Sequence, residues 1–268
     1  SLHDALPIYI AVAAGPGFLF NYIGTALLGN PQAGYVLLGA QIAAVIVEPV
    51  GANMGVVPPA PGFLEALRAV CDANAALLIF DEVITGFRLG MDGAQGYYGV
   101  TPDLTTFGKI IGGGMPVGAY GGPREVMEKI APVGPVYQAG TLSGNPVAMA
   151  AGMAQLAVLR ETPDFYVELN ARSDAFFAAA DAILSAAEVP HCLNHVGSLG
   201  CVFFNGDTVE NYADAQKSDT ARFGEFFGHM LAGGVYLAPS QFEAMFLSAA
   251  HTPDDLDAAL ARMREFRT

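Results

Sequence analysis

Two short apolar runs, each ending at an acidic residue, constrain the fold of this chain more than any other feature. The first covers residues 43–47 and ends at Glu48, and the second covers residues 76–80 and ends at Asp81. Such runs are typical of strands buried on both faces of a sheet. Between them, Pro61 opens a stretch whose apolar residues recur every three or four positions, which predicts a helix with one buried face. Strand, helix and strand in this order predict a βαβ unit with parallel strands and a right-handed crossover.

The alternation of strands and helices continues beyond this unit and predicts an α/β layer. Two further apolar segments are expected to form strands: residues 103–107 and 117–120. A long helix is predicted over residues 146–160, with Asn145 as its amino-terminal cap. Met149 and Met153 lie one turn apart on that helix, and we expect them to pack in the core.

A change of amino-acid composition near residue 163 predicts a second, smaller α+β domain. A helix rich in alanine and aromatic residues is expected over residues 165–187, and a closing helix is expected from Pro253. Apolar segments predict three strands, at residues 201–204, 235–237 and 245–249, with a helix between the first two. The predicted boundaries are therefore 1–42 for a segment that fits neither pattern, 43–162 for the large domain and 163–268 for the small one.

Charge and cysteine content exclude several classes of function. The 268 residues include 26 acidic and 12 basic side chains, and the net charge of -14 would repel the phosphate backbone of a nucleic acid. Cys71, Cys192 and Cys201 form no CxxC pair, which argues against a disulfide framework or a cysteine zinc site and favours a reducing cytoplasm. Residues 5–47 lack charge, but no apolar run in them reaches the roughly 20 residues that a membrane span needs.

Asp81 and Lys109 are the strongest candidates for chemistry. Asp81 ends a buried strand, where open α/β sheets place their ligands, although an ordinary turn or cap aspartate would look the same. Lys109 lies between an apolar strand and the triple glycine Gly112–Gly114. The glycines would let the backbone approach a flat ligand, and a partly desolvated amine has a lowered pKa that suits Schiff-base chemistry, although a flexible surface loop is an alternative. Together, the two side chains supply what a pyridine aldehyde cofactor needs: a carboxylate for the ring nitrogen and an amine for the aldehyde carbon.

A second group of potential ligands is much weaker. His191, Cys192 and His195 would have the spacing of metal ligands only in a helix. Pro190 and Gly197 flank them, and no further cluster of ligands is evident, so we do not expect a metal site.

Six motifs, in order along the chain, carry a resemblance to a known family. They are Val47–Val50, Asn53–Pro59, Asp81–Arg88, Gly108–Gly114, Gln138–Pro146 and Tyr236–Ala244. From about Ala43 to the carboxyl terminus, the chain closely resembles the glutamate-1-semialdehyde 2,1-aminomutases, pyridoxal-phosphate enzymes of the class III aminotransferase family. The resemblance implies the type I pyridoxal-phosphate transferase fold (aspartate aminotransferase-like), with a large α/β domain truncated at its amino terminus and a small carboxyl-terminal α+β domain.

The resemblance also assigns roles to residues at the cofactor. It implies that Lys109 bonds covalently to pyridoxal phosphate and shuttles protons, while Asp81 pairs with the pyridinium nitrogen. Val83 would press on one face of the ring. Asn53 would lie near the phenolic oxygen, although the preceding residues 51–52 are Gly-Ala where relatives have the reverse order or Val-Gly.

Three further residues receive roles from the same resemblance. Gly140 and Thr141 would contact the cofactor phosphate across the interface of a homodimer, and the helix beginning after Asn145 would favour an anion nearby. Glu243 would face the substrate. An ordinary solvated loop glutamate is the alternative interpretation of Glu243, because loop carboxylates are usually exposed.

The implied activity is an intramolecular amine transfer, an isomerase reaction that converts glutamate-1-semialdehyde to 5-aminolevulinate for tetrapyrrole (porphyrin) synthesis. The cofactor would start the cycle in its pyridoxamine phosphate form, and the enzyme would be cytoplasmic. The chain departs from the family at its beginning, where residues 1–42 match poorly and are interpreted as a foreign or misread segment. Nothing resembles the family's upstream phosphate loop or the aromatic residue on the opposite ring face, so we expect an incomplete form that binds the cofactor poorly alone.

Two alternatives remain open at this point. One is an ordinary class III aminotransferase acting on ornithine-like or ω-amino substrates, although such relatives lack the Pro239–Glu243 signature. The other is a catalytically inactive binding or assembly module that has kept the fold.

Overall fold

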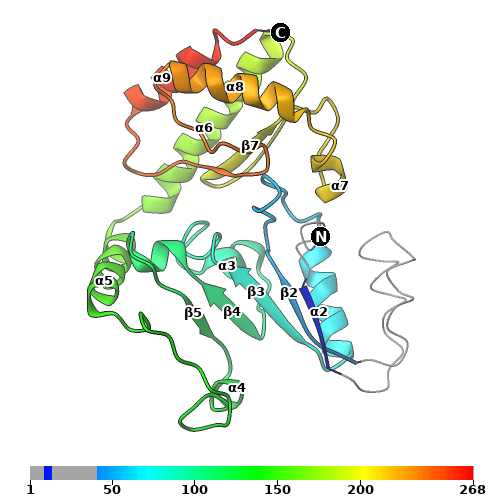
Figure 1. The fold of residues 1–268 in the computed structure, drawn as a ribbon, viewed down its shortest axis with the longest axis vertical. Coiled ribbons are helices and arrows are strands. Elements are labelled where there is room, and N and C mark those ends of the chain that lie inside the picture. Colours follow the sequence, from blue (N-terminus) through cyan, green and yellow to red (C-terminus); the bar gives the residue numbers. More distant parts are fainter. Residues whose placement is uncertain (1–8, 14–40, 268) are drawn as a thin grey trace. The chain divides into compact units, whose positions relative to one another are not determined.

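The computed structural model describes residues 9–13 and 41–267, so most of the predicted segment 1–42 lies outside the described residues. The described chain forms two compact units (Figure 1). The first consists of the described residues up to Pro49, Ala60–Phe87 and Asp92–Ala157, and the second consists of Val50–Pro59, Arg88–Met91 and the described residues from Val158 onward. Two short segments from the first half of the chain therefore belong to the second unit.

The first unit contains a five-stranded sheet. Its strands lie in the order β1 (Tyr9–Ala13), β2 (Gln41–Val47), β3 (Leu77–Glu82), β4 (Leu104–Phe107) and β5 (Ala119–Gly121). The pairs β2–β3 and β3–β4 are parallel, and the two outer pairs are antiparallel. Helix α2 (Phe63–Ala73) connects β2 to β3, which confirms the predicted βαβ unit.

The core of this unit forms where α2 covers the sheet. The buried face of α2 consists of Leu64, Leu67 and Cys71, at the three- and four-residue spacing seen in the sequence. These side chains pack with Leu78 and Phe80 of β3, both of which are completely buried. Burial of a side chain of this size stabilises the fold by about 1.5–3 kcal/mol.

Four more helical segments lie wholly or mainly in the first unit: α3 (Gly93–Tyr98), the 3-10 helix η3 (Lys109–Gly112), α4 (Arg124–Met127) and α5 (Pro146–Glu161). The Asn145 side chain accepts hydrogen bonds from the backbone N–H groups of Val147 and Ala148, which confirms the predicted cap of α5. The prediction that Met149 and Met153 are buried is wrong, because they are 38% and 73% exposed. Apolar residues surround α5 on all sides, so spacing alone cannot tell which of them face the core.

The second unit is the predicted α+β arrangement. Its elements are α6 (Phe165–Ala186), β6 (Cys192–Val196), β7 (Leu199–Phe203), α7 (Tyr212–Ala215), α8 (Thr220–Ala232), β8 (Met245–Phe246) and α9 (Pro253–Met263). The strands form an antiparallel sheet in the order β6-β7-β8. The core between this sheet and the helices contains Leu184, Val202, Phe226 and Met230. Among the described residues, no helix has the length and apolar character that crossing a bilayer requires.

Strand predictions in this unit were only partly correct. Residues 235–237 do not form a strand but follow the turn at Gly233–Gly234, and the strand expected over residues 245–249 is limited to β8. Strand β6 was not predicted, because its five residues, Cys-Leu-Asn-His-Val, form neither an apolar run nor an alternation of apolar and polar residues. His195 lies on β6, and its ring pairs with Asp174 of α6 at 3.1 Å.

Candidate functional site

The carboxyl end of β3 holds Asp81 in a defined orientation. Asp81 lies opposite Thr106 in the parallel register of β3 and β4. The Thr106 hydroxyl donates to Oδ1 of Asp81 at 3.2 Å, and the backbone N–H of Val83 donates to the same oxygen at 3.1 Å. The half-buried carboxylate is therefore fixed by its own sheet, at the edge where parallel strands commonly bind ligands.

Lys109 is the first residue of η3 and follows β4 after one glycine. Its φ of 47° is in the left-handed region, which is uncommon for a residue other than glycine and is frequent at functional sites. At Gly108 a Cβ atom would lie 3.1 Å from Cγ1 of Val83, so the backbone just before Lys109 runs against Val83. The structure thus brings Asp81, Val83 and Lys109 to the same edge of one sheet.

The expectation that Lys109 is partly desolvated is wrong for the described chain, because the residue is exposed. The triple glycine contributes a close backbone contact within the first unit. Gly113 has a φ of 56°, and a Cβ there would lie 2.4 Å from the carbonyl oxygen of Ala151. A Cβ on Gly152 would likewise lie 2.2 Å from the carbonyl oxygen of Ile111. These glycines therefore let η3 pack directly against the α5 backbone, which fixes the segment that carries Lys109.

Sequence reasoning missed Glu82, which is completely buried. Its carboxylate accepts hydrogen bonds from the Ala94 N–H at 2.6 Å, the Gln95 N–H at 3.3 Å, the Gln95 amide at 3.0 Å and the Thr85 hydroxyl at 3.1 Å. Successive side chains in a strand point to opposite faces, so Glu82 faces away from Asp81. The available signal was this alternation: an acidic residue directly after Asp81 has to enter the other side of the sheet.

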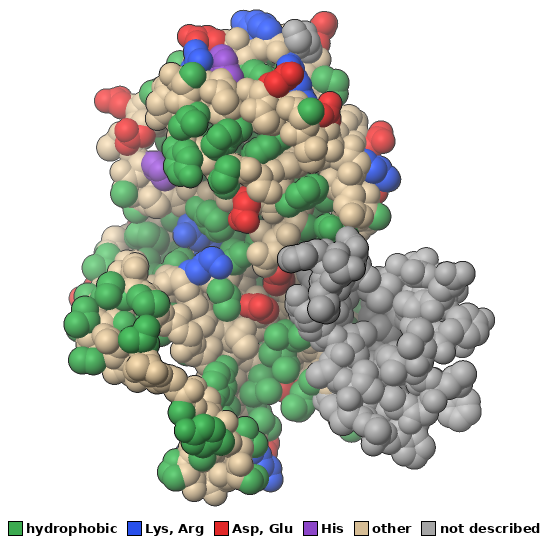
Figure 2. Space-filling model, in the orientation of Figure 1, with side chains coloured by type: hydrophobic (Ala, Val, Ile, Leu, Met, Phe, Trp, Pro, Cys, Tyr) green, Lys and Arg blue, Asp and Glu red, His purple; other side chains and the backbone are tan. Residues whose placement is uncertain are grey.

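Gly140 and Thr141 lie on the exposed segment that precedes α5. Gly140 lines a cavity of about 1210 Å³, together with Phe107 and Ile111, which lie two residues to either side of Lys109. Other apolar side chains complete this wall: Leu142, Met149, Met153 and Leu156. Figure 2 shows apolar side chains gathered over the α5 and α4 regions of the surface.

Asn53 and Glu243 belong to the second unit, on two loops that are joined by a backbone hydrogen bond. The Asn53 loop is closed by paired hydrogen bonds between Gly51 and Val57, at 2.8 and 3.0 Å. Within it, the N–H of Gly55 donates to the carbonyl of Phe242 at 2.7 Å. Asn53 and Glu243 are both exposed.

Arg88, noted in the sequence only as the last residue of a motif, binds the residues that follow Glu243. Its guanidinium donates to the Ser198 hydroxyl at 3.1 Å and to the Leu247 carbonyl at 2.9 Å, and it lies 5.1 Å from the ring centre of Phe246. Burial lowers the pKa of Arg88. The segment that contains β8 and follows Glu243 is therefore held by side-chain bonds as well as by its short strand.

Within residues 9–13 and 41–267, no group of three or more His, Cys, Asp or Glu side chains is placed to hold a metal ion. His191, which the sequence had raised as a weak candidate, instead pairs with Asp181 of α6 at 3.2 Å.

Comparison with known proteins assigns the family. The model of the class-III aminotransferase family matches residues 33–264. The chain belongs to the class-III aminotransferase family. Glutamate-1-semialdehyde 2,1-aminomutase 1 of Lachnoclostridium phytofermentans is 60% identical over 227 residues, which are 85% of this chain and 53% of that protein. The aminomutase of Ruminiclostridium cellulolyticum is 58% identical over 224 residues, or 84% and 52% of the two chains. The chain thus spans about half the length of the curated relatives it matches.

Solved structures confirm the predicted type I fold over the shared part. An ω-transaminase from Sphaerobacter thermophilus matches with a TM-score of 0.75 and 33% identity, over 83% of this chain and 51% of that one. A glutamate-1-semialdehyde aminomutase from Pseudomonas aeruginosa, in complex with PMP, matches with a TM-score of 0.74 and 28% identity, over 84% and 51%.

Proposed function

We propose that this chain is the lysine-bearing part of a pyridoxal-phosphate-dependent glutamate-1-semialdehyde 2,1-aminomutase. The enzyme would convert glutamate-1-semialdehyde to 5-aminolevulinate, in the cytoplasm, for tetrapyrrole synthesis. The observation that carries the proposal is the placement of Asp81 and Lys109 at the carboxyl edge of the adjacent parallel strands β3 and β4. The 60% identity to a relative of that name supports this substrate over others in the family.

The donor set at this edge fits the cofactor. When bound, pyridoxal phosphate supplies an electron sink that stabilises negative charge on the carbon next to the reacting nitrogen. Asp81, oriented by Thr106 and by the Val83 N–H, would keep the ring nitrogen protonated. Lys109 would hold the aldehyde carbon and move protons to and from the substrate carbon. Val83, which lies against Gly108, would support one face of the ring.

The second unit would supply the substrate side. Glu243 would face the substrate, and Asn53 would approach the phenolic oxygen of the cofactor. The hydrogen bond from Gly55 to Phe242, which joins their loops, supports a common role for these two residues.

A homodimer is part of the same proposal. In the exposed segment before α5 and on α5 itself, Tyr137, Leu142 and Met153 are 83%, 61% and 73% exposed. Large exposed apolar side chains gathered in one region of a protein are typical of an interface. A second copy would cover it, and Gly140 and Thr141 would then contact the partner's cofactor phosphate.

The alternative function is amine transfer between two different molecules, and one observation favours it. The ω-transaminase from Sphaerobacter thermophilus is as similar in structure as the aminomutase from Pseudomonas aeruginosa, with TM-scores of 0.75 and 0.74. Product analysis separates the two. The proposed isomerase forms 5-aminolevulinate from glutamate-1-semialdehyde alone, whereas a transaminase needs a separate amino donor and acceptor.

The test of the proposal uses a full-length protein in which residues 43–268 are joined to the amino-terminal part of the Lachnoclostridium phytofermentans relative. Borohydride reduction in the presence of pyridoxal phosphate, followed by peptide mapping, should place the pyridoxyl label on Lys109. Only two other lysines occur in this chain, Lys129 and Lys217. Lys109→Ala should remove the label and the turnover, while the matched variants Lys129→Ala and Lys217→Ala should keep both. A label on either of these lysines would refute the site.

Asp81→Asn separates the electron-sink role from cofactor attachment. An amide cannot hold the ring nitrogen protonated through a charge-assisted contact, so turnover should fall strongly while the label on Lys109 persists. Full activity in Asp81→Asn would contradict the assigned role. A protein that shows no chromophore and no label with pyridoxal phosphate would instead be the inactive module.

A further inference from the structure

Gln241 is an amide side chain that completes a sheet edge. It is only 2% exposed, although it lies in the loop before β8. Its Oε1 accepts from the backbone N–H of Phe204 at 3.2 Å, and its Nε2 donates to the carbonyl of Val202 at 2.8 Å. A primary amide carries the same donor and acceptor as a peptide group, so Gln241 binds β7 as a neighbouring strand would.

The position of these two bonds shows what Gln241 replaces. Strand β8 pairs with β7 only at Leu199 and Gly200, and the Leu247 N–H donates to Ser198 on the same edge. Alternate residues of a strand direct their N–H and C=O groups to the same side. Val202 and Phe204 therefore continue the edge that β8 leaves open, and the Gln241 amide satisfies two buried groups that would otherwise lack a partner.

The bonds made by Gln241 also fix its neighbours. The next carbonyl, that of Phe242, accepts the 2.7 Å hydrogen bond from Gly55, and the N–H of Glu243 donates to Ser240 at 3.2 Å. A Cβ on Gly55 would lie 2.3 Å from the ring of Phe203, so the Asn53 loop runs directly over β7. One buried amide thus sets the position of two loops at once.

We propose that Gln241 is a positioning residue that presents Glu243 and, through Phe242, the Asn53 loop to the substrate. The inference rests on the proposed function, which assigns the substrate side to Glu243. Both polar atoms of Gln241 are occupied by backbone groups, so its effect is exerted through Glu243 and not by contact with the substrate.

The substitution Gln241→Met keeps the length of the side chain and removes both hydrogen bonds. In the full-length protein it should lower kcat about ten- to hundredfold, because small displacements of a positioned group have effects of this size. Gln241→Asn keeps the amide but is one methylene too short, and it provides a second variant that retains polarity if Gln241→Met does not fold.

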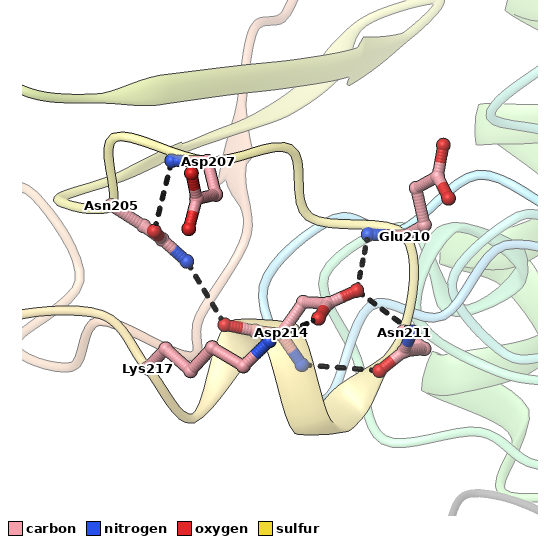
Figure 3. Close-up of polar contacts among 6 residues, drawn as sticks. All are labelled: Asn205, Asp207, Glu210, Asn211, Asp214 and Lys217. Carbon is pink, nitrogen blue, oxygen red and sulfur yellow. Dashed lines mark hydrogen bonds and ion pairs between the residues drawn. The ribbon is translucent and has the colours of Figure 1, made fainter.

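Asn205→Leu is the matched control. Asn205 is 8% exposed, its Nδ2 donates to the Asp214 carbonyl at 3.0 Å, and its Oδ1 accepts from the Asp207 N–H at 3.1 Å (Figure 3). It is thus another buried amide that joins two backbone groups of the same unit, but it supports the segment leading to α7. Asn205→Leu should leave kcat within about twofold of the parent, the change expected of a variant outside the positioned site.

Two measurements decide the inference. Amide hydrogen exchange at Gly55 and Phe204 should quicken in Gln241→Met and not in Asn205→Leu. In a double-mutant cycle, Gln241→Met combined with Glu243→Gln should lose little more kcat than the more impaired single variant. The positioning role would be overturned if the losses of kcat in the two single variants multiply in the double variant. It would also be overturned by equal losses of kcat in the Gln241 and Asn205 variants, or by unchanged amide exchange at Gly55.

The same experiment separates this inference from the proposed function. If Glu243→Gln alone leaves kcat unchanged, Glu243 has no role at the substrate and the inference fails, while borohydride labelling of Lys109 still reports on the cofactor site. If the label is found on a residue other than Lys109, the proposed function fails. The exchange data then show only that Gln241 stabilises the two loops.

Discussion

Replacement of Glu82 by glutamine should destabilise the first unit by an amount that the structure allows us to calculate roughly. The carboxylate accepts four hydrogen bonds, two on each oxygen, in a completely buried site. An amide offers one acceptor oxygen, and its NH2 group would face donors. If the NH2 replaces Oε1, the Gln95 side chain can turn to accept, but the Gln95 backbone N–H cannot. One buried backbone donor without a partner costs about 1–3 kcal/mol, and the loss of charge assistance at Ala94 adds to this.

The assay is urea unfolding of the full chain, followed by circular dichroism, with amide exchange at Ala94 and Gln95 as a local readout. We expect Glu82→Gln to lower the free energy of unfolding by about 2–4 kcal/mol, the sum of the lost bond and the weakened contact. Glu65→Gln is the matched control, because Glu65 is exposed on α2 in the same unit. A change within about 0.5 kcal/mol, the range usual for surface substitutions, would refute the reasoning.

Three further predictions concern stability. Asn145→Ala should lower the free energy of unfolding by about 1 kcal/mol in urea unfolding, because α5 loses its cap. Phe177→Ala should cost about 3–5 kcal/mol in the same assay, since the ring is completely buried and packs against Gly200 and His195. Burial raises the pKa of Cys201 to about 12. The Cys201 thiol therefore keeps its proton in the folded state above about pH 8.5, where the unfolded state loses it. The free energy of unfolding should fall between about pH 8.5 and pH 12, and it should fall less steeply in Cys201→Ala.

Local periodicity was sufficient to predict much of the first unit. The apolar runs before Glu48 and Asp81 and the helical spacing after Pro61 each report a buried face within a few residues, which is why β2, α2 and β3 formed as predicted. The same logic placed Asp81 at the end of a strand. The proximity of Lys109 to Val83 required one more fact, the parallel register of β3 and β4, which the sequence suggests but does not state.

Features that depend on partners distant in sequence could not be predicted. Strand β8 pairs with β7 only at Leu199 and Gly200, because the Gln241 side chain occupies the rest of that edge. Residues 235–237 have the composition of a strand but pair with no neighbouring strand. The exposure of Met153 depends on which face of α5 meets the sheet, and an all-round apolar helix gives no indication of this. Gln241 appears in the sequence as one polar loop residue among several, and only its bonds to β7 distinguish it.

The chain passes from the first unit to the second shortly after two of the parallel strands. Val50–Pro59 begins three residues after β2 ends, and Arg88–Met91 begins seven residues after Asp81; both segments belong to the second unit. The chain therefore leaves the sheet after the carboxyl ends of β2 and β3, the edge that carries Asp81. Lys109, by contrast, is held by contacts of η3 and α5 within the first unit.

Variants in the two units should have different effects. Cofactor attachment depends on Lys109 and Asp81, whose contacts are made by the sheet and η3, whereas Glu243 and Asn53 depend on Gln241, Phe242 and Gly55 in the second unit. Changes at Gln241 or Glu243 should therefore lower turnover without moving the borohydride label from Lys109. The effects of these variants on cofactor labelling and on turnover should therefore be separable, and loss of the label in Gln241→Met would contradict this separation.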